Sequence, residues 1–108
     1  MESFGIHDFT NIDVDGIGTL TQLEEVSITF GGRIHHIEQV AELPHLRYLD
    51  LCATRHKKLD FLQLLSPDVD LDLSFAEVEE DIDLRIIQRF PNRTCEDIVI
   101  NGKKYENL

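Results

Sequence analysis

An apolar pattern recurs along this chain at a nearly fixed interval. The spacing L-x-x-L-x-L covers residues 46–51, and an equivalent apolar spacing covers residues 23–28. Weaker copies begin at Met1 and Asp68, and a last copy, at residues 95–100, follows after a longer step than the others. A repeat of about 22 residues predicts a chain of stacked units that bury their apolar residues against one another.

Each copy predicts a short strand, because apolar and polar residues alternate inside it. The expected strands cover residues 3–7, 25–30, 48–52, 70–74 and 97–101. Helical spacing and a following proline predict helices at 33–43, 56–65 and 77–90. The segment from 10 to 20 is rich in Asp and Gly, and it predicts a loop or a single turn. The length of the last helix accounts for the longer final step.

The unit resembles that of the leucine-rich-repeat family, in which L-x-x-L-x-L precedes a small or Asn-like residue and then a helix or turn. The resemblance covers the whole chain. It implies an α/β fold, namely a short right-handed leucine-rich-repeat-like solenoid with about five parallel strands on one face and short helices on the other. The family's usual Asn is replaced in every unit, and of the replacements Thr54 alone offers a comparable side-chain hydrogen bond. These places hold Phe9, Gly31, Thr54, Ala76 and Lys103.

The composition is that of a folded domain with a strong negative charge. A length of 108 residues with 42% hydrophobic residues predicts a single domain over residues 1–108. The formal net charge of -11 predicts repulsion of nucleic acids and anionic membranes, and attraction of basic partners. The sequence shows neither an apolar run long enough to span a membrane nor a secretion signal, and its two cysteines are far apart. We therefore expect a cytoplasmic protein.

The expected strands gather acidic side chains on one face, because residues between the apolar positions point away from the core. These residues form three rows: Ser3, Glu25, Tyr48, Asp70 and Asp97; Gly5, Ser27, Asp50, Asp72 and Val99; His7, Thr29, Cys52, Ser74 and Asn101. The resemblance implies protein binding on this face. We expect Tyr48 to serve as an aromatic anchor there. An acidic chain also carries carboxylates wherever it meets water, so a merely solvated face is the competing interpretation. The predicted partner-binding residues are Glu25, Tyr48, Asp50, Cys52, Asp70, Asp72 and Asp97.

Metal-binding patterns are weaker, and we expect neither a metal nor another cofactor. A match to a calcium loop fails at Leu73, because that place needs a Gly. The matching residues are Asp68, Asp70, Asp72, Ser74 and Glu79. The five histidines lack chelating spacing, and we expect them to face solvent.

The remaining catalytic candidate is Cys52, with His7 two strands away. A thiol on an acidic face has a raised pKa, and the sequence offers no group to orient the histidine. We therefore expect a non-enzymatic protein-protein interaction module that binds a basic partner. A calcium- or metal-binding domain and a small enzyme using Cys52 are the alternatives. Size and acidity also match, by analogy alone, the bacterial immunity proteins that neutralise basic nuclease toxins. The oligomeric state stays open.

Overall fold

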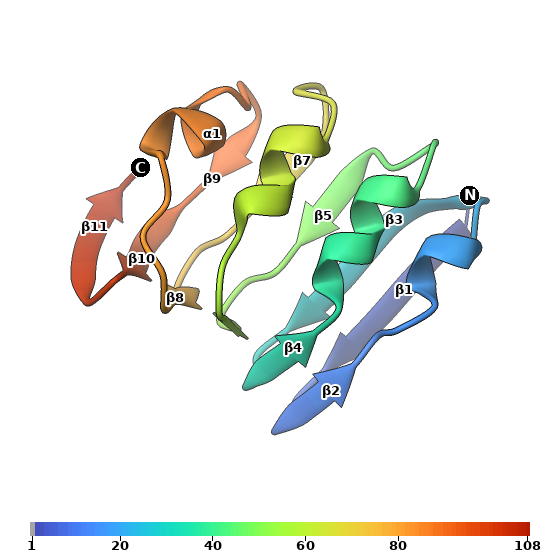
Figure 1. The fold of residues 1–108 in the computed structure, drawn as a ribbon, viewed down its shortest axis with the longest axis horizontal. Coiled ribbons are helices and arrows are strands. Elements are labelled where there is room, and N and C mark those ends of the chain that lie inside the picture. Colours follow the sequence, from blue (N-terminus) through green and yellow to red (C-terminus); the bar gives the residue numbers. More distant parts are fainter. Residues whose placement is uncertain (1) are drawn as a thin grey trace.

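Two β-sheets run the length of the molecule (Figure 1). Our computed structural model describes residues 2–108, so Met1, predicted for the first apolar place of the repeat, lies outside the described residues. The first sheet consists of five parallel strands in the order β1 (Glu2–His7), β3 (Leu23–Thr29), β5 (Tyr48–Asp50), β7 (Asp70–Asp72) and β9 (Arg93–Thr94). The chain forms a strand of this sheet, leaves it, and returns to it one place further along.

Neighbouring strands of the first sheet pair at nearly equal steps along the sequence. Glu25 of β3 lies opposite Tyr48 of β5, and Tyr48 in turn lies opposite Asp70 of β7. The first four predicted strands are therefore confirmed, although β5 and β7 are shorter than predicted. The register therefore places residues at equivalent positions of successive repeats side by side.

A second sheet is a feature that the apolar pattern does not predict. Its parallel strands are β2 (Asn11–Asp13), β4 (Arg33–His35), β6 (Arg55–His56), β8 (Glu77–Val78) and β10 (Glu96–Ile100). At its end β11 (Lys103–Asn107) turns back and pairs antiparallel to β10. One row of this sheet advances by the same step along the sequence at every strand, through Asn11, Arg33, Arg55, Glu77 and Val99.

The fifth strand of the first sheet differs from the prediction. The predicted strand at 97–101 overlaps β10, which pairs with β8 in the second sheet. The first sheet ends instead with β9, whose Thr94 lies opposite Asp72 at the regular step of the repeat. The apolar pattern misses β9 because Arg93 takes the middle apolar place. Its guanidinium donates to three backbone carbonyl oxygens, those of Gln88, Phe90 and Leu108.

The helical segments are shorter than predicted. Those of the described residues are the 3-10 helices η1 (Ile17–Thr19), η2 (Ile37–Glu42) and η3 (Asp60–Leu64), and the α-helix α1 (Leu84–Gln88). The predicted helices are wrong at their starts, because those residues form β4, β6 and β8. Apolar residues at steps of three, such as Leu59, Leu62 and Leu65, follow the period of a 3-10 helix. Within residues 2–108, no helix has the length and apolar character needed to cross a membrane.

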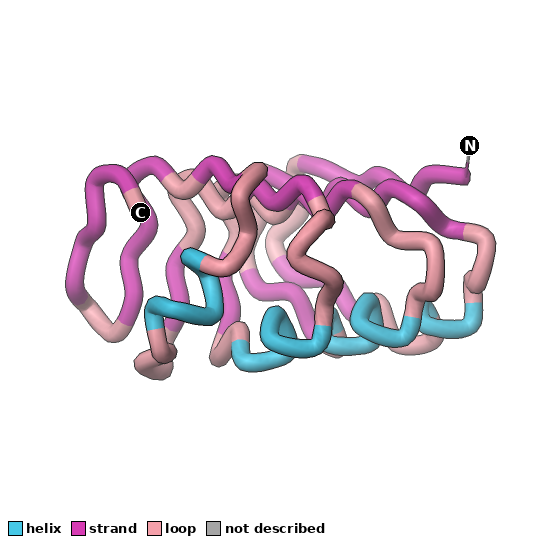
Figure 2. The backbone as a smooth tube through the Cα atoms, turned by 90° about the horizontal axis from the view of Figure 1, so that it is seen from above, coloured by secondary structure: helices cyan, strands magenta, loops and turns pink. Residues whose placement is uncertain are grey.

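The core lies between the sheets and the helical segments. The first sheet lines one side of the molecule and the helical segments line the opposite side (Figure 2). Leu49 and Leu71 on the inner face of the first sheet are 0% exposed, as is Ile98 of β10. The predicted core residues Leu46, Leu51 and Cys95 are also buried. The molecule is therefore a small, compact α/β fold built on a five-stranded parallel sheet.

Candidate functional site

The outward side of the first sheet, here called the strand face, brings together six of the seven predicted site residues. On β5 and β7, Leu49 and Leu71 are fully buried whereas Tyr48 and Asp50 are half-buried and Asp70 is exposed. This alternation is the expected result of a strand that packs one side on a core. The register then places six residues on adjacent strands or directly after them: Glu25, Tyr48, Asp50, Cys52, Asp70 and Asp72.

The seventh predicted residue, Asp97, is not on the strand face. It lies in β10, with a φ of 52°, and its Oδ1 atom is 3.6 Å from Nζ of Lys104 on β11. Val99 and Asn101, predicted as the ends of the other two rows, belong to β10 and to the turn that follows it. These three placements are wrong because the prediction follows the displaced copy of the repeat at residues 95–100.

A different acidic residue, Glu96 at the start of β10, lies beside that end of the strand face. Its backbone N–H donates to the Ser74 hydroxyl at 3.2 Å, so Glu96 lies beside the row that contains Cys52 and Ser74. Its side chain is exposed, whereas that of the preceding Cys95 is buried. The constant step along the sequence from Cys52 to Ser74 to Glu96 is the signal that finds it.

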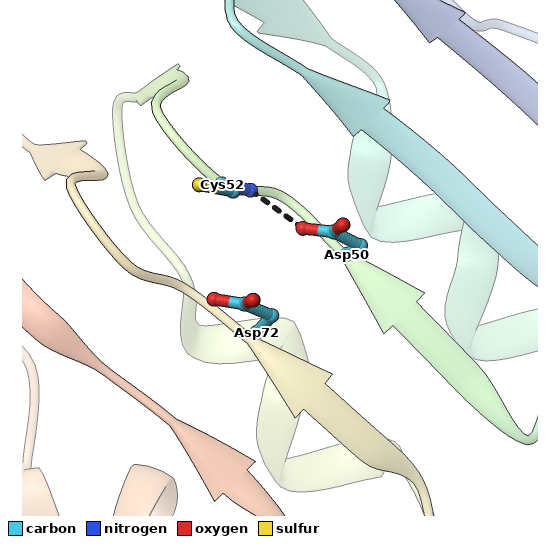
Figure 3. Close-up of side chains that lie close together, drawn as sticks. All are labelled: Asp50, Cys52 and Asp72. Carbon is cyan, nitrogen blue, oxygen red and sulfur yellow. Dashed lines mark hydrogen bonds between the residues drawn. The ribbon is translucent and has the colours of Figure 1, made fainter.

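Asp50 and Asp72 form a like-charged pair across adjacent strands (Figure 3). Oδ1 of Asp50 accepts a hydrogen bond from the backbone N–H of Cys52 at 3.0 Å, and Oδ1 of Asp72 accepts one from that of Ser74 at 2.9 Å. The two carboxylates are thus held in the same way at the end of their strands. Like charges at directly opposed positions destabilise a sheet. The backbone donors offset this repulsion only in part, because they are neutral.

Tyr48 completes the centre of the strand face. Its hydroxyl donates to Oδ2 of Asp50 at 3.1 Å. Burial, together with the charges of Asp50, Asp72 and Asp70, raises the pKa of Tyr48 to about 12. The phenol therefore remains a neutral donor at physiological pH, and its ring supplies an apolar surface among the carboxylates.

A groove of about 460 Å³ crosses the start of these strands. Glu25, Tyr48 and Asp70 line it from the first sheet, and Asp68 adds a further carboxylate from the loop before β7. The one basic residue of its lining, Arg47, has its Nη1 atom 3.5 Å from Glu24 Oε1. The groove is consequently acidic and has an aromatic ring in its wall, which suits a lysine or arginine side chain.

Cys52 has the properties of an unreactive thiol. Burial, followed by the charges of Asp72 and Asp50, raises its pKa. Nucleophilic attack requires the thiolate, which a raised pKa makes scarce at neutral pH. His7 lies two strands away, because Thr29 of β3 lies between them in the ladder.

Asp50, Cys52 and Asp72 also offer three ligand atoms that all lie within 4.8 Å of one another. Two carboxylates and a thiolate are ligands for a divalent cation such as Zn²⁺. The oxygens of Asp50 and one oxygen of Asp72 already accept hydrogen bonds from protein donors, and the thiol would have to lose its proton. The partial match to a calcium loop falls on β7, where Asp70 and Asp72 flank the buried Leu71 on a strand.

One titratable side chain is buried away from the strand face. His56, predicted to face solvent, is 1% exposed because it takes the inward place on β6 that Val78 takes on β8. The Thr54 hydroxyl donates to the Leu51 carbonyl at 2.6 Å and therefore accepts from His56 Nε2 at 2.7 Å. His56 Nδ1 has no partner among the described residues. Burial, and secondarily the charge of Arg33, lowers the pKa of His56 to about 4.

The strand face combines negative charge with an aromatic contact surface. Its carboxylates accept hydrogen bonds from cationic side chains, and Tyr48 offers contact area between them. Comparisons with known protein families, with characterised proteins and with solved structures found no match.

Proposed function

We propose that this chain is a short right-handed leucine-rich-repeat-like solenoid that forms one cytoplasmic domain and binds another protein through the strand face. The nearly equal steps of its two ladders support stacked units of one design. The partner is basic, and binding involves no catalysis by this chain. The raised pKa of Cys52 supports a non-enzymatic role.

The observation that carries this proposal is the lack of countercharge on the strand face. Within residues 2–108, no ion pair joins Asp50, Asp70 or Asp72 to a basic side chain. The same chain pairs acidic residues elsewhere, as between Arg55 Nε and Glu77 Oε2 at 3.1 Å. A face that keeps like charges opposed and unpaired gains stability when a basic partner covers it.

A narrower version of the proposal concerns the kind of basic partner. Nuclease toxins are basic because they bind nucleic acid, and an acidic surface imitates that ligand. On this version the chain is a bacterial immunity protein. A toxin gene directly beside the gene for this chain would support it, and neighbours without any basic nuclease would contradict it.

Affinity capture with charge-reversed variants tests the strand face itself. Asp50→Lys with Asp72→Lys should abolish capture of a basic partner, because two attractions become two repulsions. The matched control is Glu38→Lys with Glu80→Lys, which makes the same charge change at exposed residues on η2 and after β8. The control should retain capture. Equal loss in both variants would indicate an effect of net charge alone, and retention in both would exclude this face.

A further inference from the structure

The chain leaves the first sheet at a corner whose backbone is left-handed in every unit. The five corner residues have positive φ angles between 52° and 62° and take equivalent places in successive units. They are Asp8, Phe30, Ala53, Phe75 and Asp97. The fold therefore requires a positive φ at this place, whatever the residue.

Two of these corners carry a phenylalanine, which is poorly suited to the place on two counts. Positive φ is tolerated by Asp and Asn but is unfavourable for bulky side chains. Phe30 and Phe75 are also 61% and 51% exposed, among the most exposed large apolar residues in the described chain. The corner itself does not need a phenylalanine, because Ala53 makes the same turn between them. Strain and exposure at one residue point to a role outside the fold.

The two phenylalanines take the corners on either side of the Ala53 corner, and the surface over these three corners is here called the notch. The backbone N–H of Phe30 donates to the Cys52 carbonyl and that of Gly31 to the Ala53 carbonyl, so the Phe30 and Ala53 corners are adjacent. Likewise Ala53 N–H donates to the Ser74 carbonyl, directly before Phe75. Two strand spacings of about 4.8 Å separate the two phenylalanines by about 10 Å. Ala53 carries only a methyl group, so no large side chain of this corner lies between them.

This notch is continuous with the strand face. Asp50 lies three residues before Ala53 and Asp72 lies three residues before Phe75, on the strands that lead into these corners. An apolar contact at the rim of a charged surface excludes water from the neighbouring ion pairs and strengthens them. The occupant must then combine an apolar side chain with neighbouring cations.

We infer that the basic partner inserts one aliphatic or aromatic side chain between Phe30 and Phe75, above Ala53, while adjacent lysines or arginines bind Asp50 and Asp72. This inference rests on the proposed function, since it assumes that the strand face binds a basic protein. It adds that the partner carries a hydrophobic anchor, and that Phe30 and Phe75 are the two residues that contact this anchor.

Labelled peptides at low salt test the anchor. One probe has the sequence Lys-Arg-Leu-Arg-Lys, and its matched control has Ser in place of Leu. The Leu peptide should bind the wild-type chain about tenfold more tightly, because burying one leucine contributes that much. Phe30→Asn with Phe75→Asn should remove this difference, whereas Asp50→Asn with Asp72→Asn should weaken both peptides.

The outcomes separate the two proposals. Equal binding of the two peptides to the wild-type chain, with weakening only by the aspartate variant, would overturn the notch and leave the acidic face standing. Binding that is insensitive to the aspartate variant, or no binding of either peptide, would count against both. Leu64→Asn, at a residue 70% exposed on η3, is the control for general loss of apolar surface and should leave both affinities unchanged.

Thermal unfolding gives a second readout. The change in melting temperature would have the opposite sign if the two phenylalanine rings had a structural role. Asn accepts positive φ more readily than Phe, so each Phe→Asn change should raise the melting temperature by about 4 °C. A fall in melting temperature in both variants would show that the rings hold the corners together and would overturn the inference.

Discussion

The two sheets of this molecule are built on the same repeat yet treat their charges in opposite ways. On the outer side of the second sheet, Arg55 of β6 pairs with Glu77 of β8. Arg33 of β4 pairs with Glu79, which directly follows β8. On the strand face, Asp50 opposes Asp72, and among the described residues neither forms an ion pair with a basic side chain. One sheet therefore pairs its charges, whereas the other leaves charges unpaired, as the proposed binding of a basic partner requires.

This difference in charge pairing contributes little to the free energy of unfolding. The ion pairs stabilise the second sheet, and the opposed like charges destabilise the first. An exposed ion pair contributes about 0.5 kcal/mol, and an opposed like-charged pair costs a similar amount. Neither decides whether the chain folds, because the buried leucines contribute far more. The arrangement of charge can therefore vary without loss of the fold.

The second sheet has a buried ionisable side chain, His56, on its inner side. We expect this residue to lower the stability of the fold at acid pH. The pKa of His56 falls to about 4 in the folded chain from its usual 6.5, so the unfolded chain takes up this proton first. Stability is complete above about pH 6.5 and should fall by about 3 kcal/mol as the pH drops to 4. Urea unfolding between these pH values measures the loss.

His56→Val is the informative variant, because valine already fills the equivalent place at Val78. It should remove this part of the pH dependence and the unpartnered Nδ1 atom together, while the Thr54 hydroxyl keeps its bond to Leu51. His45→Gln, at an exposed histidine, should leave the pH dependence in place. An unchanged profile in His56→Val would mean that other groups cause the acid loss.

The end of the first sheet depends on Arg93 rather than on the leucine that the repeat favours. Arg93→Leu restores the apolar motif but removes the donors to three backbone carbonyls. We expect a loss of about 2 kcal/mol in the free energy of unfolding, measured by urea at neutral pH. Arg85→Leu, at an exposed arginine of α1, should cost far less. A stability gain in Arg93→Leu would show that the motif outweighs these hydrogen bonds.

The difference in charge pairing between the two sheets predicts two small effects on stability, of opposite sign. Asp72→Asn keeps the oxygen that accepts from Ser74 and removes one repelling charge, so it should stabilise the chain by about 0.5 kcal/mol at low salt. Arg55→Gln breaks the pair with Glu77 and should destabilise the chain by a similar amount. Both differences should shrink in about 1 M salt. Effects of the same sign in the two variants would contradict the difference in charge pairing between the two sheets.

The part of the fold that the sequence predicts is the part with strict alternation. Leu49 and Leu51 flank Asp50 on one strand, and Leu71 and Leu73 flank Asp72 on another, so burial and exposure follow from the pattern alone. This is why the centre of the strand face could be predicted.

The second sheet escapes the same reasoning because two strands at its middle are too short to alternate. β6 and β8 contain two residues each, and the apolar residues that follow step by three and suggest a longer helix. A constant step through Ile12, Ile34, His56, Val78 and Ile100 is the signal that remains, and His56 interrupts it. Asp97 was assigned to the wrong place for a related reason, since Arg93 conceals the strand that ends the first sheet.

The antiparallel β11 gives the ladder an end that differs from its middle. Between β3 and β7 every unit meets a neighbour of the same design, whereas beyond β10 the chain turns back on itself. A duplication of one repeat unit in the middle of the gene would therefore preserve both ladders and leave the closing hairpin untouched. Selection can lengthen such a molecule one unit at a time, and each added unit would widen the strand face without a new fold having to evolve.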